Sequence, residues 1–321
     1  MKKICLVLML LCGLLSSQAR AQNYPSKPIR LVVPFAAGGT TDLMARIVAE
    51  PLGKLLGQTV VVDNKAGGGG VLGAAEVARA APDGYTLGLA TASSNATNPA
   101  INPKVPYDPL KDFSPIANMA ATPNVLAVNP AFPAKDFAGL LAELRRKPGQ
   151  YDYASSGTGG IGHLQMELFK NLTQTFLVHI PYSGGGPALR DTVGGQVMII
   201  FDNLPSALPH IKDKRLIAIA VATPERLADL PAVPTFKELG LEPVNRMAYY
   251  GILGPKNLPK EVVDKISNGV KKALQDPAVV KRIQDTGSLV VGNSPEEFAA
   301  QIKAEFEVYK KVVDQHKLKL D

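Results

Sequence analysis

The stretch IRLVVPFAAGGTTDLMARI, which spans residues 29–47, decides the fold class. It begins with an apolar run at residues 29–34, continues through a glycine turn, and ends in a pattern that is typical of a helix. A buried strand that runs through a glycine turn into a helix is the first half of a βαβ unit. The stretch therefore predicts an α/β protein with a mostly parallel sheet. Turns of this kind commonly hold an anion, although this one contains no Lys or Arg.

The same alternation of short apolar runs and helical patterns continues along the chain. Further strands are expected at residues 59–62, 86–90, 124–128, 151–154, 177–180, 197–201 and 217–221. Helices are expected at residues 42–56, 72–79, 137–146, 163–171, 187–192, 260–274, 278–286 and 295–316. The alternation indicates repeated βαβ units.

Two breaks interrupt this alternation. The Pro-rich residues 98–115 predict a long surface connection, and residues 239–253 lead out of an α/β region into a helix-rich tail. Two breaks that bound a middle α/β block indicate one domain inserted between two pieces of another. We expect residues 22–124 and 248–321 to form a first lobe, and residues 125–247 to form a second lobe.

The N-terminus predicts export. Two lysines precede an apolar core at residues 4–15, and the triplet Ala-Arg-Ala at residues 19–21 forms a cleavage site. The apolar run is shorter than the roughly 20 residues that a membrane-spanning helix needs, which favours cleavage over a membrane anchor. We therefore expect a signal peptide at residues 1–21 that is cleaved near Ala21 and Gln22.

The amino-acid composition limits the classes of partner and cofactor that we expect for this protein. Both cysteines, Cys5 and Cys12, lie in the expected signal peptide, so the mature chain would contain no thiol, disulfide or Cys-bound metal. Removal of Lys2, Lys3 and Arg20 lowers the formal net charge from +7 to +4, which is a mild basic surplus. The chain has no Trp, 6% aromatic residues and no dense Lys/Arg stripe, which argues against a nucleic-acid partner.

Three strand-glycine-helix junctions recur, with the sequences PFAAGGTTD at residues 34–42, YASSGTGGIGHL at residues 153–164 and IPYSGGGPAL at residues 180–189. The first N–H groups of a helix lack intrahelical partners and carry partial positive charge, so they bind carboxylate or phosphate. Hydroxyls that can donate to the same anion are those of Thr40, Thr41, Ser155, Ser156, Thr158 and Ser183. The alternative for the first junction is a turn capped by Asp42. Three junctions from two blocks favour one shared site in a cleft.

The sequence gives little support for a cofactor site or a catalytic site. None of the junctions has the P-loop pattern, and a GxGxxG match at residues 68–73 is separated from the preceding strand by residues 63–66, which favours a tight loop over a dinucleotide site. The four histidines include no pair at zinc-ligand spacing, and a GxSxG elbow is absent. Ser156 and His163 remain an alternative nucleophilic dyad, but a residue this far along a helix more often caps or packs. We expect no catalytic residue, no cofactor and no metal.

Two further polar groups follow expected strands. Asp202 follows the strand at residues 197–201, at the end where open α/β sheets place ligands. It could receive an ammonium or hydroxyl group of a ligand, or form a turn with Asn203. Ser93, Ser94 and Asn95 either set specificity or form an ordinary polar loop.

Five motifs occur in a fixed order along the chain: PFAAGGTTDLMAR, VVVDNKAGGGGVLGAAEVARAAPDGYTL, GTGGIGHLQMELF, YSGGGPALRDTVGGQV and FDNLPSALPHI. As a set they resemble the tripartite tricarboxylate transporter substrate-binding proteins, also called Bug receptors. The resemblance implies a periplasmic location and the two-lobed fold of type II periplasmic binding proteins, a Venus flytrap. Each lobe would be a mostly parallel sheet flanked by helices.

The resemblance also implies where a ligand binds. The turn at residues 35–40 and the loop at residues 156–159 would grip a carboxylate from opposite lobes, largely through backbone groups and bridging water. Tyr182, Gly184 and Gly185 would lie beside it, with His163 on the helix below the second loop. The candidate ligand-binding residues, including Asp202 from its strand end, are Phe35, Ala36, Gly38, Gly39, Thr40, Ser156, Gly157, Thr158, Gly159, His163, Tyr182, Gly184, Gly185 and Asp202.

The function implied by the resemblance is a monomeric receptor, not an enzyme. It would capture a small organic carboxylate, such as an amino acid or a mono-, di- or tricarboxylate, and deliver it to integral-membrane transporter subunits. Two alternatives stay open: a sensor subunit that presents the liganded form to a signalling partner, and an exported hydrolase that uses Ser156 and His163. No Arg lies in the junctions to demand a second carboxylate, so the ligand's identity stays open.

Overall fold

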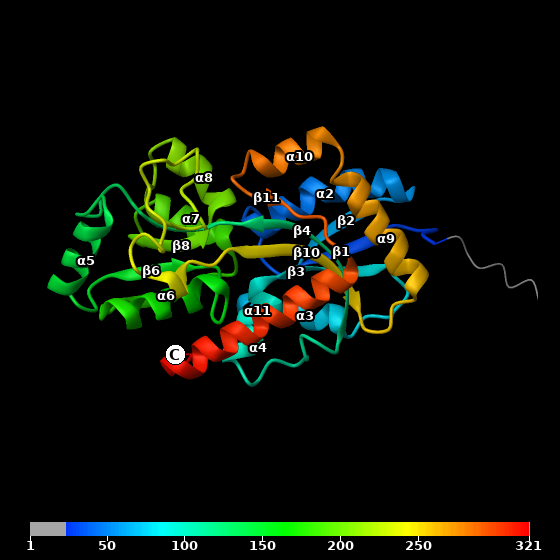
Figure 1. Cartoon of the computed structure of the whole chain (residues 1–321), viewed down its shortest axis with the longest axis horizontal. Helices are drawn as coiled ribbons and strands as arrows, with labels where there is room; N and C mark the ends of the chain where they lie inside the picture. Colours follow the sequence, from blue (N-terminus) through cyan, green and yellow to red (C-terminus); the bar gives the residue numbers. More distant parts are fainter. Residues whose placement is uncertain (1–23, 321) are drawn as a thin grey trace, which may run out of the picture.

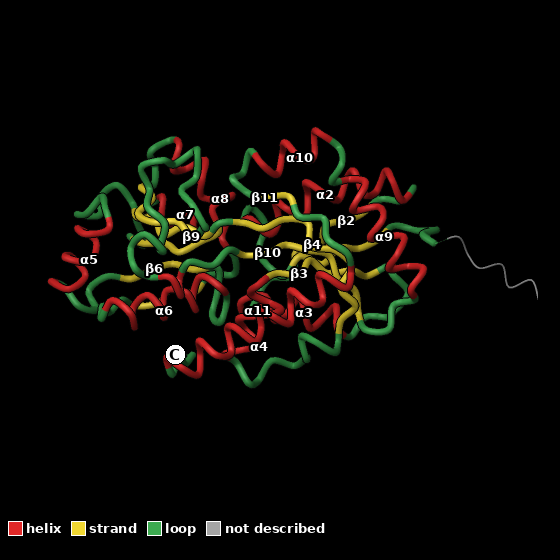
Figure 2. The backbone as a smooth tube through the Cα atoms, in the orientation of Figure 1, coloured by secondary structure: helices red, strands yellow, loops and turns green. Residues whose placement is uncertain are grey.

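The computed structural model describes residues 24–320, which form two β-sheets placed side by side along the long axis of the molecule, each with helices around it (Figure 1). Figure 2 shows the strands in two groups with helices on their outer faces. We call the body around the six-stranded sheet the first lobe and the body around the five-stranded sheet the second lobe. The expected signal peptide lies outside the described residues. Within residues 24–320, no helix has the length and apolar character that crossing a membrane requires.

The first lobe contains a sheet with the strand order β11-β4-β10-β3-β1-β2. Its strands are β1 (Ile29–Val33), β2 (Val60–Asn64), β3 (Thr86–Thr91), β4 (Phe113–Thr122), β10 (Ala248–Pro255) and β11 (Leu289–Val290). Its helices are α2 (Thr40–Leu56), η1 (Gly68–Gly70), α3 (Val71–Ala78), η2 (Ser93–Thr97), α4 (Asn98–Ile101), α9 (Lys260–Ala273), α10 (Pro277–Gln284) and α11 (Pro295–His316). Of these, η1 is a 3-10 turn and η2 is a π-helical turn.

The second lobe contains a sheet with the strand order β7-β6-β8-β5-β9. Its strands are β5 (Asn124–Val128), β6 (Asp152–Ser155), β7 (Val178–Pro181), β8 (Ile199–Asn203) and β9 (Ile217–Ala222). Its helices are α5 (Phe137–Arg146), α6 (Ile161–Thr173), α7 (Gly185–Val193), α8 (Leu204–Lys212) and η3 (Glu242–Val244).

Helices cover both faces of the second sheet, so its strands need apolar side chains on both faces, and β5 meets this requirement. Leu126 and Val128 belong to an apolar cluster with Phe169 of α6. Their neighbours Val125 and Ala127 belong to a separate cluster with residues of α7 and α8. Because successive side chains of a strand point to opposite faces, a strand buried on both faces is apolar throughout.

Both sheets are mixed, so the expectation of mostly parallel sheets is wrong in this respect. β1 pairs in parallel with β2 and β3, whereas β10 pairs antiparallel with both β3 and β4. In the second sheet β6 pairs in parallel with β7 and β8, whereas β5 pairs antiparallel with β8 and β9. The chain enters β5 and β10 from the other lobe, so both strands start at the boundary between the lobes. Their neighbours β3, β4, β8 and β9 end at this boundary, and β5 and β10 therefore run antiparallel to them.

The chain passes between the sheets in two places. Pro123 alone separates β4 from β5, and residues 223–247 connect β9 back to β10. Asn124 Nδ2 donates to the carbonyl of Arg246 at 2.8 Å, which ties the two passages together. The expected division of the chain after residues 124 and 247 stays a prediction.

The expected surface connection at residues 98–115 is wrong at its start. Asn98 is fully buried, and so is the π-helical turn η2 that precedes it. Tyr107, also buried, donates its hydroxyl to the carbonyl of Ser94 at 2.6 Å. Ser94, Thr97 and Asn98 are buried with hydrogen-bond partners, which sequence polarity alone does not reveal.

Candidate functional site

The first and third junctions meet between the lobes. They connect β1 to α2 and β7 to α7. The Ala36 N–H donates to the carbonyl of Ser183 at 3.0 Å across the two lobes. A Cβ added at Gly39 would lie 3.1 Å from the backbone nitrogen of Gly186, so the two helix N-termini are in near backbone contact. The absence of side chains at these glycines allows this approach.

A chain of polar groups connects α2 to the buried end of β8. The hydroxyl oxygens of Thr40 and Ser206 lie 2.8 Å apart, and the Ser206 N–H donates to Thr40 Oγ1 at 3.2 Å. Ser206 Oγ in turn donates to Asp202 Oδ2 at 2.9 Å. Since the Ser206 proton goes to Asp202, the Thr40 hydroxyl donates to Ser206. The hydrogen bonds therefore run from the Thr40 hydroxyl of the first lobe, through the Ser206 hydroxyl, to the Asp202 carboxylate of the second lobe.

Asp202 is buried beside the N-terminus of α7. The sequence predicted that Asp202 follows the strand, but in the structure it is the fourth residue of β8. A Cβ added at Gly185 would lie 2.8 Å from Asp202 Oδ2, which shows how tightly the carboxyl group packs against the third junction. Burial raises the pKa of Asp202 to about 6, against the opposing effect of the hydrogen bond from Ser206. Whether Asp202 contacts a ligand stays a prediction.

The second junction, between β6 and α6, contacts the buried segment of the first lobe that contains η2 and α4. Ser93 Oγ accepts a hydrogen bond from the Ile161 N–H at 3.0 Å. Thr97 Oγ1 donates to the Gly159 carbonyl at 2.9 Å, and Asn98 Nδ2 donates to the Thr158 carbonyl at 3.0 Å. Three polar side chains of the first lobe therefore hold one loop of the second.

Sequence reasoning missed Thr97 and Asn98, although it singled out Ser93. The available signal was their position in the polar run that follows β3, a parallel neighbour of β1. Strands that run in parallel end at the same edge of a sheet, so this run and the first junction had to lie near each other.

The glycine loop η1 also borders the second junction. A Cβ added at Gly69 would lie 2.3 Å from the Thr158 carbonyl oxygen, and one added at Gly157 would lie 3.1 Å from Gly69 Cα. Gly69 has a φ of +61°, in the region that favours glycine. The ring of Phe35 from the first junction packs on Gly70 of the same loop. The GxGxxG stretch is thus a tight loop, and it forms part of the boundary of the site.

Several backbone donors at the junctions have partners within the protein. The Gly38 N–H donates to Asp42 Oδ2 at 3.2 Å, so the alternative role of Asp42 in satisfying the first turn is present. Burial raises the pKa of Asp42, but hydrogen bonds from Arg46, Gly38 and Asn64 outweigh it, and the net pKa is lowered. The carboxylate is therefore ionised at neutral pH. It also accepts from Arg46 and from Asn64, which in turn donates to the Phe35 carbonyl.

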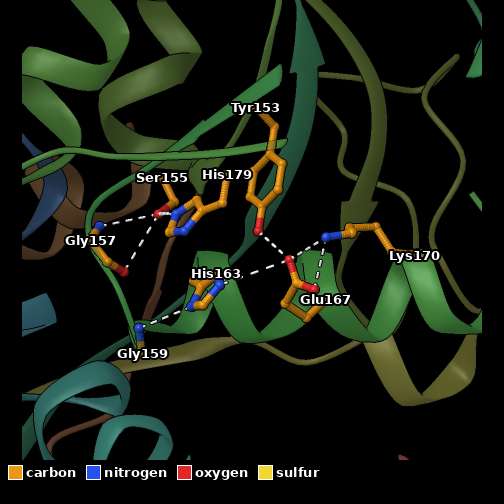
Figure 3. Close-up of polar contacts among 8 residues, drawn as sticks. All are labelled: Tyr153, Ser155, Gly157, Gly159, His163, Glu167, Lys170 and His179. Atoms are coloured by element: carbon orange, nitrogen blue, oxygen red, sulfur yellow. Dashed lines mark hydrogen bonds and ion pairs between the residues drawn. The ribbon is translucent and has the colours of Figure 1, made fainter. Parts of the chain in front are cut away.

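His163 lies beneath the second junction (Figure 3). Its side chain is fully buried, and its Nδ1 accepts a hydrogen bond from the Gly159 N–H at 3.0 Å. The Ser155 hydroxyl lies 2.7 Å from His179 Nε2 and accepts from the Gly157 N–H at 3.2 Å. The serine in contact with an imidazole is thus Ser155, buried in β6, and the Nδ1 of His163 is engaged by the loop rather than by Ser156.

The remaining residue of the third junction, Tyr182, points toward α7. Its hydroxyl donates to Asp191 Oδ2 at 2.8 Å. Burial, reinforced by Asp191, raises the pKa of Tyr182 to about 12, so the hydroxyl stays protonated at neutral pH. The Tyr182 carbonyl faces Gly157, and a Cβ added at that glycine would lie 3.0 Å away. Among residues 24–320, no group of three or more His, Cys, Asp or Glu side chains is arranged to hold a metal ion.

Comparison with known proteins identifies the family. Residues 44–318 match the model of the tripartite tricarboxylate transporter family receptor. The chain belongs to this receptor family. BugT of Bordetella pertussis is 35% identical to this receptor over 307 residues, which cover 95% of the chain and 94% of BugT. The resemblance to the Bug receptors is therefore confirmed.

Solved structures confirm the two-lobed fold of this receptor. The structure of a periplasmic transporter is 52% identical, with a TM-score of 0.91, and the match covers 93% of this chain and 100% of that one. MatC from Rhodopseudomonas palustris, solved with bound malate, is 33% identical with a TM-score of 0.88, and the match covers 90% and 100% of the two chains. An R. palustris protein solved with adipate has the same identity and TM-score, over 92% of this chain and 99% of that one.

Proposed function

We propose that this receptor captures a small organic carboxylate between its lobes in the periplasm and delivers it to the membrane subunits of a tripartite tricarboxylate transporter. The observation that carries the proposal is the meeting of α2, α6 and α7 with polar groups of the facing lobe, each helix beginning at a glycine junction. Helix N-termini favour anions. The two relatives solved with malate and adipate carry dicarboxylates, which agrees with such a site.

In this proposal the first junction supplies Phe35, Ala36, Gly38, Gly39 and Thr40 to the ligand's surroundings. From the second lobe come Ser156, Gly157, Thr158, Gly159, Tyr182, Gly184 and Gly185. Gly159 shapes the site rather than donating, because its N–H is bonded to His163. Asp202 would receive a ligand hydroxyl or ammonium group at the end of β8. Fixed dipoles without a cation give capture that can be reversed, as a delivering receptor requires.

The proposal includes binding without chemical conversion, by a monomer. Incubation of the identified ligand with the protein should leave the ligand's NMR spectrum unchanged over hours. Light scattering during size-exclusion chromatography should give the mass of a single chain. Turnover of the ligand would contradict the first part of this proposal, and a dimer mass would contradict the second.

The primary test is a thermal-shift screen. Residues 22–321 would be purified, freed of bound ligand by unfolding and refolding, and heated with malate, adipate, other carboxylates and amino acids. One-site binding at 100 times Kd stabilises the folded protein by about 2.7 kcal/mol, so a true ligand should raise the melting temperature visibly. The matched control is the amide of each acid, which should produce no shift. No shift with any acid would contradict the proposed function.

A further inference from the structure

Two stacked imidazole rings lie under the second junction. His163 comes from α6 and His179 from β7, and their ring centroids are 4.0 Å apart with an interplanar angle of 8°. Figure 3 shows that each ring is linked to a different N–H of the loop above it. His163 is bonded to Gly159 directly, and His179 reaches Gly157 through Ser155. The pair therefore supports the loop at two points.

The bond to Gly159 specifies the protonation state of His163. A ring nitrogen that accepts a hydrogen bond from an N–H cannot itself carry a proton. Nδ1 is therefore bare and the proton of the neutral ring lies on Nε2, which faces Glu167 Oε1 at 3.8 Å. A second proton, on Nδ1, would place two N–H groups against each other at a separation of 3.0 Å between nitrogens. The bond to the loop exists only while His163 is neutral.

The peptide between Thr158 and Gly159 transmits this state to the other lobe. Its N–H donates to His163, and its carbonyl accepts from Asn98 Nδ2 of the first lobe at 3.0 Å. Both groups belong to one planar unit, so a rotation that relieves the first contact misaligns the second. The same loop has φ angles of +134° at Gly157 and +74° at Gly159, which glycine adopts without the strain that a side chain would add.

Charged and titratable groups around His163 have opposing effects. Glu167 on the same helix favours a protonated ring, but Lys170 binds both of its carboxylate oxygens at 2.8 and 2.9 Å. Tyr153 of β6 also donates to Glu167 and stacks on His179. His179 opposes a positive charge on the adjacent ring through like-charge repulsion if it is itself protonated. An unperturbed imidazole changes charge between pH 5 and 8.

We propose that His163 is a positioning residue whose neutral form holds the Thr158–Gly159 peptide in the orientation that joins the lobes, so that its protonation weakens ligand binding. The inference rests on the proposed function, since it concerns the affinity of the same site. In this proposal His163 makes ligand affinity depend on pH although its buried side chain need not touch the ligand. His179 shares this task through Ser155.

The test replaces the titrating acceptor by one that does not titrate. In His163→Asn, the side-chain oxygen lies close to the position of Nδ1 and accepts the same hydrogen bond at all pH values. In His163→Leu, no acceptor is present. Calorimetric titration with the acid identified by the thermal-shift screen would give Kd from pH 5 to pH 8 for the wild type and both variants. Circular dichroism at each pH would establish that the proteins are folded.

We expect wild-type affinity to fall about tenfold per pH unit over the range in which His163 is protonated, beyond any change shown by His163→Asn. The Asn variant, measured with the same acid, reports the titration of the ligand itself. His163→Leu should bind at least tenfold more weakly than wild type at pH 7.5. His316→Asn, at the end of α11, serves as the control and should keep the wild-type profile. Identical pH profiles for wild type and His163→Asn would overturn the inference, whereas absence of binding in every protein would instead overturn the proposed function.

Discussion

At the scale of the residue, glycine determines how closely the lobes approach each other. Gly39 has φ and ψ of −93° and 175°, which any residue adopts, so its importance lies in its missing side chain. A Cβ there would press on the backbone of Gly185 and Gly186 at 3.1 to 3.3 Å. Both positions belong to α7 of the other lobe, so a side chain at residue 39 would obstruct the contact between lobes without straining its own backbone.

We therefore expect Gly39→Val to weaken ligand binding at least tenfold, because the branched side chain keeps α2 and α7 apart. The melting temperature without ligand should change by no more than a few degrees. Calorimetry and thermal unfolding would measure the two effects. Ala142→Val, on the exposed face of α5, adds the same kind of side chain outside the site and should leave affinity unchanged. Equal affinities of all three proteins would show that close approach at Gly39 is not needed.

Asp202 gives the protein a pH-dependent stability with a defined sign. Burial raises its pKa from 3.8 to about 6 in the folded protein. A carboxyl group of this kind stabilises the fold when protonated, so its contribution is full below pH 4 and is lost as the pH rises through 6. Relative to Asp202→Asn, the free energy of unfolding of the wild type should fall between pH 4 and pH 7 by on the order of 3 kcal/mol.

Urea unfolding of both proteins at pH 4, 5.5 and 7 would measure this difference. Asn keeps the shape and the hydrogen bonding to Ser206 while removing the charge. A difference in unfolding free energy that stays constant with pH would mean that Asp202 titrates normally. A loss of affinity in Asp202→Asn at constant stability would add support for a contact between Asp202 and the ligand.

At the scale of the element, the segment of η2 and α4 fixes the start of α6. Asn98 is fully buried and donates to the carbonyls of Gly68 at 2.8 Å and Thr158 at 3.0 Å. Asn98→Asp replaces this donor by a carboxylate that faces two acceptors. Because a buried unsatisfied acceptor costs about 1–3 kcal/mol and a charged one more, we expect ligand affinity to fall by at least tenfold.

Calorimetry with the identified acid would test this effect. Asn268→Asp, on the exposed surface of α9, makes the same chemical change away from the site and should bind as the wild type does. If Asn98→Asp bound as tightly as its control, the contact between α4 and the second junction would have no part in capture.

The elements also show how far sequence reasoning reached. The glycine junctions at β1, β6 and β7 follow from apolar runs that lead into helical patterns, and their meeting at strand ends follows from the rules of parallel pairing. The direction of β5 and β10 did not follow, because a strand's own sequence does not record which lobe the chain comes from. The burial of Asn98 was missed because a polar run reads as a loop until its partners, Gly68 and Thr158, are known. The stack of His163 on His179 likewise joins residues of different elements, so the sequence separation of the two histidines does not predict it.

At the scale of the whole molecule, the contacts between the lobes describe a joined form. Without ligand, fewer forces hold these surfaces together, so we expect a more open average conformation in solution. Both native cysteines precede residue 22, so introduced cysteines would be the only thiols in a chain of residues 22–321. Fluorescence transfer between dyes at Ala142→Cys on α5 and Ala278→Cys on α10 should increase when ligand is added.

The control pair, Asn268→Cys with Ala278→Cys, lies entirely in the first lobe and should show constant transfer. Both control positions are exposed, so labelling should not disturb the core. Constant transfer in the pair that spans the lobes, at a ligand concentration that saturates binding, would show that capture does not involve closure.

The passage from β4 to β5 has a mechanical consequence. Pro123 is its only residue outside a strand, and hydrogen bonds to neighbouring strands hold both of its ends. Asn124 fastens this passage to the returning one at Arg246. The lobes are therefore joined at this passage without slack. A relative motion of the lobes has to change the backbone angles of residues at or next to Pro123, which makes this short passage the place where such a motion is set.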